Sequence, residues 1–218
     1  MLKKLGFVSL FFLLFLTACN TTAANGEANN LSSEKYEELL SNTNEFRIKE
    51  ATFSLGKAYN VYVDDTLVAT VKGEVIKVTG DVLTMTDPND KLLIKEKQIK
   101  RWGFKFTRSG VFLDENDNEI GYLGEKTITK LTNLGHYFHF YDKNKEEIGV
   151  SDEIVFSFLK KYDFKDSKGN IAYKVKQEPG FVDKYTVTVN DDKNIPRLQA
   201  IIMICIQDAI KDAEDEKE

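Results

Sequence analysis

The feature that most constrains the fold is a segment near the C-terminus that is apolar on every face of a helix. The residues from Ala200 to Ile206 are all apolar, and Pro196 stands just before, where the first turn of a helix tolerates it. A helix that is apolar all round must be surrounded by a membrane or by a protein core. The run is far shorter than the roughly 20 residues that a membrane span needs. The sequence therefore predicts a buried helix over residues 195–212.

The residues before this helix follow a period of two and predict β-strands. From about residue 46 to residue 190, segments rich in β-branched and aromatic residues alternate with short polar turns. Most turns begin with Asp, whose carboxylate can bond the backbone two residues on. A second strand then opens with a short apolar pair, at Val68-Ala69, Leu92-Leu93, Ile120-Gly121, Ile148-Gly149 and Ile171-Ala172. Each unit is predicted to be a β-hairpin.

These hairpins and the remaining strands make about twelve strands, a size at which an antiparallel sheet can close. Repeats of about 25 residues can also build a solenoid. Hairpins that each reverse direction instead favour an up-and-down sheet that closes and leaves no edge unpaired. Because the C-terminal helix needs apolar contact on every side, we expect a mainly β fold, a closed antiparallel barrel wrapped around that helix.

The first twenty residues are typical of a bacterial lipoprotein signal. A basic start at Lys3 and Lys4 is followed by an apolar run over residues 7–16, and the segment ends in Leu16-Thr17-Ala18-Cys19. This is the layout of a secretory signal, too short to span a membrane as a stable helix. The last four residues resemble the lipobox, in which the cysteine receives a diacylglycerol and becomes the new N-terminus. The alternative is an ordinary signal peptide that contains a cysteine.

The chain is therefore expected to have five parts. These are a lipoprotein signal peptide over residues 1–18, a flexible tether over 19–30, a short helix over 31–44, the barrel with its central helix over 45–212 and an acidic tail over 213–218. Two acyl chains on Cys19 would hold the mature chain stably on a membrane. The expected location is the outer face of a bacterial plasma membrane.

The hairpins and the terminal helix together resemble the LURP-one-related and tubby C-terminal-like proteins. The resemblance rests on strands that end in Asp and restart with Val-Ala, Ile-Gly or Ile-Ala, and on the Ala200–Ile206 helix; it covers about residues 46–212. It implies the same barrel around a hydrophobic C-terminal helix, a fold that phospholipid scramblases are thought to share. It also implies a non-enzymatic role. Tubby domains bind phosphoinositide head groups, a ligand not expected outside a bacterial cell.

Composition and motifs argue against several functions. The chain has 30 Lys+Arg against 35 Asp+Glu, and loss of the signal peptide leaves a formal charge of −7, which disfavours a nucleic-acid binder. Two cysteines cannot build a disulfide framework, and Cys205 lies in the apolar helix, where it acts as a small hydrophobe. Phosphate-binding loops, nucleophile elbows and zinc-protease motifs are missing from the sequence. We expect no catalysis, no cofactor and no metal.

Two histidines and two turns are the remaining candidates for metal ligands. His136 and His139 are three residues apart on a predicted strand and should face opposite sides. Two turns offer oxygen donors at most positions of a calcium loop but lack its glycine; they are Asp114-x-Asn116-x-Asn118 with Glu125, and Asp142-x-Asn144-x-Glu146 with Glu153. We interpret both as ordinary hairpin turns. Weak calcium binding at millimolar levels is the alternative.

One stretch is strongly basic in an otherwise acidic chain. Within 18 residues it holds one acid and seven bases: Lys91, Lys95, Lys97, Lys100, Arg101, Lys105 and Arg108. Much of the acidity lies in residues 208–218, which we expect to be a solvated tail. The stretch is therefore a candidate surface for anionic lipid head groups or an anionic wall polymer. The alternative is solvated strand faces with lysines that protect sheet edges.

The sequence as a whole predicts a membrane-anchored extracytoplasmic lipoprotein that acts as a non-catalytic binding or interaction module. Its expected partners are the membrane, through Cys19, and an anionic lipid or wall polymer. One alternative is a scramblase-like or lipid-handling protein, which a helix inside the barrel disfavours. Another is an extracellular hydrolase, which would need a cleft joining His136 or His139 to acidic groups.

Overall fold

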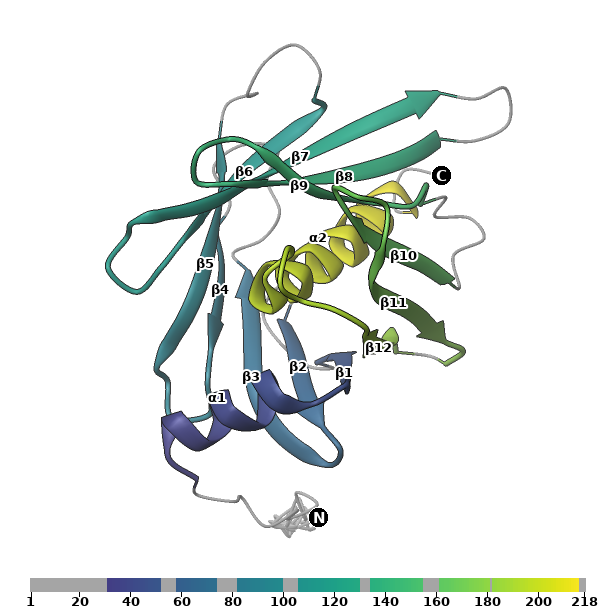
Figure 1. Cartoon of the computed structure of the whole chain (residues 1–218). Helices are drawn as coiled ribbons and strands as arrows, with labels where there is room; N and C mark the ends of the chain where they lie inside the picture. The colour runs from purple at the N-terminus through teal and green to yellow at the C-terminus, as the bar shows by residue number, and fades with distance from the viewer. Residues whose placement is uncertain are drawn as a thin grey trace, which may run out of the picture. The chain divides into compact units, whose positions relative to one another are not determined.

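The computed structural model describes residues 31–51, 58–73, 82–99, 106–129, 134–154, 161–180 and 182–215. In these ranges the chain forms an N-terminal helix, α1 (Ser33–Asn42), then a closed barrel of twelve strands, and finally a C-terminal helix, α2 (Arg197–Asp215) (Figure 1). The strands are β1 (Glu45–Glu50), β2 (Ala58–Val63), β3 (Thr66–Gly73), β4 (Val82–Thr86), β5 (Leu92–Ile99), β6 (Arg108–Leu113), β7 (Glu119–Thr129), β8 (Leu134–Asp142), β9 (Glu147–Ser151), β10 (Lys161–Asp166), β11 (Ile171–Glu178) and β12 (Lys184–Val189).

The strands follow one another around the barrel in chain order. Each pairs antiparallel with the next, and β1 pairs with β12, so that every strand has two hydrogen-bonded neighbours. This topology confirms the closed antiparallel barrel predicted from the hairpin pattern. Because the sheet closes on itself, none of the twelve described strands is an edge strand.

Five hairpins carry the same irregularity close to their turns. In the β2–β3 hairpin Val61 pairs with Ala69 while Tyr62 pairs with Leu67, which leaves Val68 as the extra residue of a β-bulge. The other hairpins repeat this register shift, with extra residues Leu93, Ile120, Ile148 and Ala172. Bulges increase the bend and twist of a sheet, and a set of them at one end helps it to close. The apolar pairs of the sequence are therefore the bulge positions.

Two of these pairs contain glycine where the barrel wall meets the helix. A Cβ on Gly149 would lie 2.4 Å from Cδ1 of Ile195 and 2.6 Å from the backbone oxygen of Lys165. A Cβ on Gly121 would lie 2.8 Å from Nε2 of Gln199. The small residue thus lets the wall approach the start of α2 closely.

The lumen of the barrel is filled by α2, which the strands surround in Figure 1. Residues 200–205 are fully buried. They belong to one core with the inward side chains of the strands, among them Tyr59, Phe138, Phe140 and Tyr173. Each buried isoleucine of this helix contributes about 1.5–3 kcal/mol relative to an exposed one. The central helix predicted from the apolar run is confirmed.

Residues 208–212 lie in the helix, as the division of the chain into parts expects, and differ from the second expectation, drawn from charge, of a solvated tail beginning at residue 208. Asp208, Ala209 and Ile210 are 0%, 2% and 3% exposed, and α2 continues to Asp215. The expectation is wrong at these positions because the Asp208 carboxylate has hydrogen-bond donors inside the barrel, described below. Neither helix in the described ranges has the length and hydropathy of a membrane span.

The two ends of the barrel are built differently. The turn end carries the short connections of the hairpins β2–β3, β4–β5, β6–β7, β8–β9 and β10–β11, together with α1 and the start of α2. At the opposite end, called the far end, the odd-numbered strands finish and the last turns of α2 lie. Tyr36 and Leu40 of α1 are buried in the barrel core at the turn end.

Candidate functional site

The bases predicted to form one anion-binding surface are separated in the structure. Three are already in ion pairs: Lys91 with Glu37, Lys95 with Asp117 and Arg108 with Glu125. Lys95 and Lys97 point outward from β5, whereas Arg108 faces inward, opposite the buried Glu125. Lys100, Arg101 and Lys105, like Cys19, lie outside the described residues. The strand period of two sends the described bases to different sides of the wall, so they do not form one cationic surface.

In the turns considered as calcium loops, the first aspartate accepts hydrogen bonds from backbone amides of its own turn. Asp114 Oδ1 accepts hydrogen bonds from the amides of Asn116 and Asn118, both at 2.9 Å. Hydrogen bonds from Asn118 hold the pKa of Asp114 below its ordinary value. Equivalent pairs of bonds occur at Asp87, Asp142 and Asp166. This shared geometry supports the interpretation as hairpin turns.

The two histidines lie on opposite faces of β8, as the strand period predicts. His136 faces inward, with Nδ1 2.7 Å from Oε1 of Glu125, and the two side chains are only 2% and 3% exposed. Glu125 also contacts Arg108 at 3.2 Å and Thr127 at 3.2 Å. His139 faces outward, 3.3 Å from Glu147. A His–Glu pair could relay a proton, but burial of both groups does not suit contact with a substrate.

A second interior cluster at the far end surrounds Asp208. Its Oδ1 accepts a hydrogen bond from the Tyr185 hydroxyl at 2.5 Å, and its Oδ2 accepts one from Tyr59 at 3.0 Å. Burial raises the pKa of Asp208 to about 6, and the charge of Asp183 acts in the same direction. The cluster therefore fixes α2 to β2 and β12 through a carboxyl group that titrates well above its ordinary range.

The same cluster holds the one group of described residues whose spacing could suit a metal ion. Carboxylate oxygens of Glu50, Asp183 and Asp208 lie within 4.8 Å of one another. The Lys211 amine contacts Asp183 at 2.8 Å and already supplies a positive charge there. Both carboxylate oxygens of Asp208 already accept a hydrogen bond from a tyrosine hydroxyl. We therefore assign these carboxylates a role in holding the helix.

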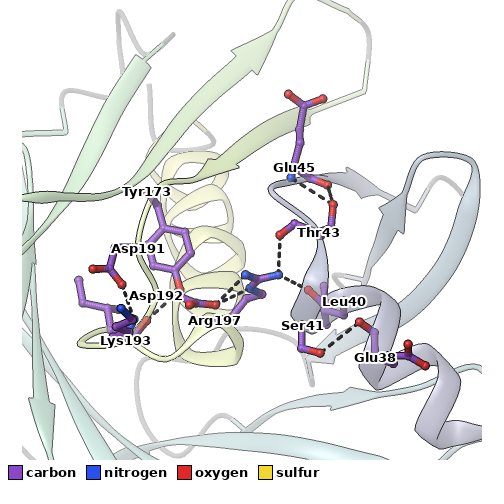
Figure 2. Close-up of polar contacts among 11 residues, drawn as sticks. Glu38, Leu40, Ser41, Thr43, Glu45, Tyr173, Asp191, Asp192, Lys193 and Arg197 are labelled. Atoms are coloured by element: carbon purple, nitrogen blue, oxygen red, sulfur yellow. Dashed lines mark hydrogen bonds and ion pairs between the residues drawn. The ribbon is translucent and has the colours of Figure 1, made fainter.

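At the turn end, Arg197 ties α2 to α1, as Figure 2 shows. Its Nη1 donates to the carbonyl oxygens of Leu40 and, at 2.9 Å, of Thr43. Its Nε and Nη2 lie 3.0 Å and 2.7 Å from Oδ2 of Asp192. The last turn of α1 contains no base. Arg197 supplies the positive charge and the donors that the C-terminus of a helix favours.

A groove of about 410 Å³ lies beside Arg197. Its lining includes four leucines, four acids and two bases: Leu40, Leu92, Leu93, Leu198, Glu37, Asp114, Glu115, Asp192, Lys91 and Arg197. Both bases are already in ion pairs with acids of the same groove. The groove that contains Lys91 is therefore net acidic and does not suit an anionic ligand.

A different group of bases gathers on the outer surface of β10, β11, β12 and β1, here called the basic face. Inward neighbours such as Ile48 and Phe164 are fully buried, so the alternate residues point outward. The outward positions of these four strands hold three acids, Glu45, Asp163 and Glu178, and seven bases, Arg47, Lys49, Lys161, Lys165, Lys174, Lys176 and Lys184.

Five lysines of the basic face are exposed: Lys49, Lys161, Lys174, Lys176 and Lys184. Within the described part of the chain no ion pair involves the first four, whereas Lys184 pairs with Glu178, and Arg47 and Lys165 pair with Asp65 and Asp152. This face could not be predicted from the sequence, because its bases come from two distant segments, residues 45–50 and 161–189, that only strand register brings together. The alternation Lys174-Val175-Lys176 was the available signal.

No protein-family model matches the chain, and no curated protein matches it. Two solved structures are similar to it. A protein from Arabidopsis thaliana is 14% identical with a TM-score of 0.33, over 76% of this chain and 91% of that one. A DUF1329 family protein from Desulfovibrio piger is 8% identical with a TM-score of 0.25, over 72% and 87%. These low scores carry no argument about function.

Proposed function

We propose that the chain is a tubby-like, lipid-anchored lipoprotein on the outer face of a bacterial plasma membrane. In this proposal it acts as a non-catalytic binding module for an anionic lipid or wall polymer. The observation that carries the proposal is the filled lumen. Residues 200–205 of α2 are fully buried and occupy the centre of the barrel. A ligand must then use the outer surface, and exposed lysines gather on one part of that surface.

The alternatives receive less support from the same residues. A lipid-handling barrel would need space for an acyl chain, but α2 takes up the lumen. A hydrolase would need His136 or His139 in a cleft with an acid, but His136 and Glu125 are both buried, and His139 contacts Glu147 on the outer side of the wall. A binding role needs neither an empty lumen nor a histidine that reaches a substrate.

The covalent anchor matters because of the overall charge. Without residues 1–18 the chain carries a formal charge of −7. Such a chain is repelled by an anionic membrane at long range, and a charged patch acts only within about one Debye length, roughly 8 Å at physiological salt. Two acyl chains on Cys19 would supply the residence that electrostatics alone does not.

The anchor is tested by expressing the full chain in a Gram-positive host fed with a clickable fatty acid. Cys19→Ala should lose the label and leave the membrane fraction after a high-salt wash. Cys205→Ala is the matched control, because Cys205 is buried in α2. This variant should keep both the fatty-acid label and its place in the membrane fraction. Label or membrane residence retained by Cys19→Ala would contradict the proposal.

The non-catalytic role has its own test. The purified full chain should release no product from ester, phosphodiester or glycoside substrates. Hydrolysis that disappears in His136→Ala would overturn this part of the proposal and favour the hydrolase.

A further inference from the structure

The basic face contains two pairs of lysines placed directly opposite each other on neighbouring strands. Lys49 lies opposite Lys184 across β1 and β12, and Lys161 lies opposite Lys176 across β10 and β11. Like charges in such positions destabilise a sheet. The fold therefore carries a local repulsion that an anionic surface touching this face would relieve.

Protection of sheet edges does not account for these lysines. Lysines on an exposed edge strand prevent pairing with another chain. Here β1, β10, β11 and β12 each have two hydrogen-bonded neighbours in the closed barrel. There is no edge for the lysines to protect, so their position calls for another reason.

Another part of the outer wall, on β7 and β8, shows that the bases are not spread evenly. Its outward positions include Tyr122, Tyr137, His139 and Tyr141, with Lys126 as a base between them. The excess of four bases over acids on the basic face stands out in a chain whose overall formal charge is negative. Among the described residues the outward positions of β3 and β5 also hold bases, Lys72, Lys95 and Lys97, but Lys95 is paired with Asp117, so the basic face gathers more exposed lysines outside ion pairs.

We propose that the basic face docks onto the anionic phospholipid surface of the membrane that carries the chain. This inference rests on the proposed function, since it needs the anchor at Cys19. The flexible tether expected from the sequence over residues 19–30 would keep the domain within roughly 20 Å of the lipid, so that docking would be an intramolecular event at high effective concentration. Each lysine close to an anionic leaflet strengthens such docking by about fivefold. A tethered domain thus meets lipid phosphate before any other polyanion.

The test uses the lipidated full chain in vesicles of phosphatidylcholine, with or without phosphatidylglycerol. An amine-reactive reagent labels the lysines, and mass spectrometry gives the rate at each site. Lys49, Lys174 and Lys176 should react at least tenfold more slowly in the anionic vesicles. Salt at 1 M should restore the rates, because the Debye length falls to about 3 Å. Lys97 of β5 and Lys126 of β7 lie outside the basic face and should react equally in both kinds of vesicle.

Charge-reversed variants give a matched comparison. Lys174→Glu/Lys176→Glu should abolish the protection of Lys49. The control Lys97→Glu/Lys126→Glu makes the same change of charge at two other outward, exposed positions. In this control Lys49 should remain protected from labelling. If the first variant does not fold, the labelling rates of the wild-type chain in the two kinds of vesicle still test the docking proposal.

Three outcomes overturn the docking proposal. The first is equal labelling of Lys176 in the two kinds of vesicle, with the protein anchored in both. The second is protection by a soluble glycerol-phosphate polymer but not by phosphatidylglycerol, which would favour a wall polymer. The third is failure of the protein to enter vesicles at all, which also overturns the anchor and so is distinguishable from the first two.

Discussion

The two ends of the barrel use polar groups in opposite ways. At the turn end, four aspartates bind the backbone of their own turns, within four residues along the chain. At the far end, Asp208 binds hydroxyls of Tyr59 and Tyr185, and Glu125 binds Arg108 and His136. The first set of bonds is local, whereas the second joins strands and helix that are far apart in sequence.

This difference indicates which parts of the fold should respond cooperatively to mutation. Local bonds in separate turns share no partners, so changes there should add independently. Buried side chains that share hydrogen bonds polarise one another and should respond together. Arg197 is the longest-range exception at the turn end, since it joins α2 to α1 over more than 150 residues of chain, farther than Lys91–Glu37 or Asn194–Asp166.

The largest expected effect comes from Arg197→Met, which removes that exception. The change keeps the apolar stem, but it leaves the carbonyls of Leu40 and Thr43 without their donor and Asp192 without its cation. Breaking a fully buried ion pair costs about 3–5 kcal/mol, and although Asp192 is 37% exposed, the two carbonyls also lose their donor. We expect a loss of that size in the free energy of unfolding, measured by urea titration, and faster hydrogen exchange throughout α1.

Arg197→Lys is the matched control, because it keeps the charge but not the several donors of the guanidinium. It should lose less stability than Arg197→Met and still expose α1 to exchange. Unchanged exchange in α1 with either variant would show that this contact does not hold the two helices together.

The next effect is a pH dependence at the far end. The pKa of Asp208 is raised from 3.8 to about 6, so between these values the native state binds more protons than the unfolded one, and stability falls as pH rises. At 1.36 kcal/mol per pH unit, the loss amounts to about 3 kcal/mol. Asp208→Asn should remove it, leaving the free energy of unfolding nearly flat from pH 4 to pH 6.

Asp183 provides the control for that window. Burial acts to raise its pKa, but Lys211 and other donors outweigh this, and the pKa is lowered below 3.8. Its contribution is therefore present above pH 3.8 and is lost only as the pH falls further. Asp183→Asn should reduce the slope between pH 4 and pH 6 without abolishing it, because the charge of Asp183 is removed while burial, the larger cause of the raised pKa of Asp208, remains. If the free energy of unfolding depended on pH in the same way in the wild-type protein and in Asp208→Asn, the role given to Asp208 would be contradicted.

The same contrast explains how much of the molecule could be predicted from sequence. Strand alternation, Asp turns and the apolar run are local signals, and they yielded the barrel and its central helix. The hairpin pairs even marked the bulges, since Val68 and its four counterparts are the extra residues. Each of these features depends on neighbours within a few positions.

Long-range partners could not be predicted in this way. Asp208 was assigned to a solvated tail because nothing in the local sequence shows that two tyrosines more than 20 residues away reach it. The basic stretch at residues 91–108 looked continuous because a sequence does not show which face each base takes. The basic face depends on register among β10, β11, β12 and β1, which only the closed barrel fixes.

The smallest effect lies at the turn end and tests whether its turns are independent. Four turns share one geometry, and their fourth residue has a positive φ: Asp90 at 62°, Asp117 at 61°, Lys145 at 69° and Gly169 at 85°. No atom lies within 4 Å of a Cβ built on Gly169, so Gly169→Ala changes only backbone conformation. It should cost about 1 kcal/mol. Asp90→Gly should stabilise by a similar or smaller amount, because it relieves the same strain in another turn. The double variant should equal the sum of the two in urea titrations, and a clear departure from the sum would mean that the turn end is coupled like the far end.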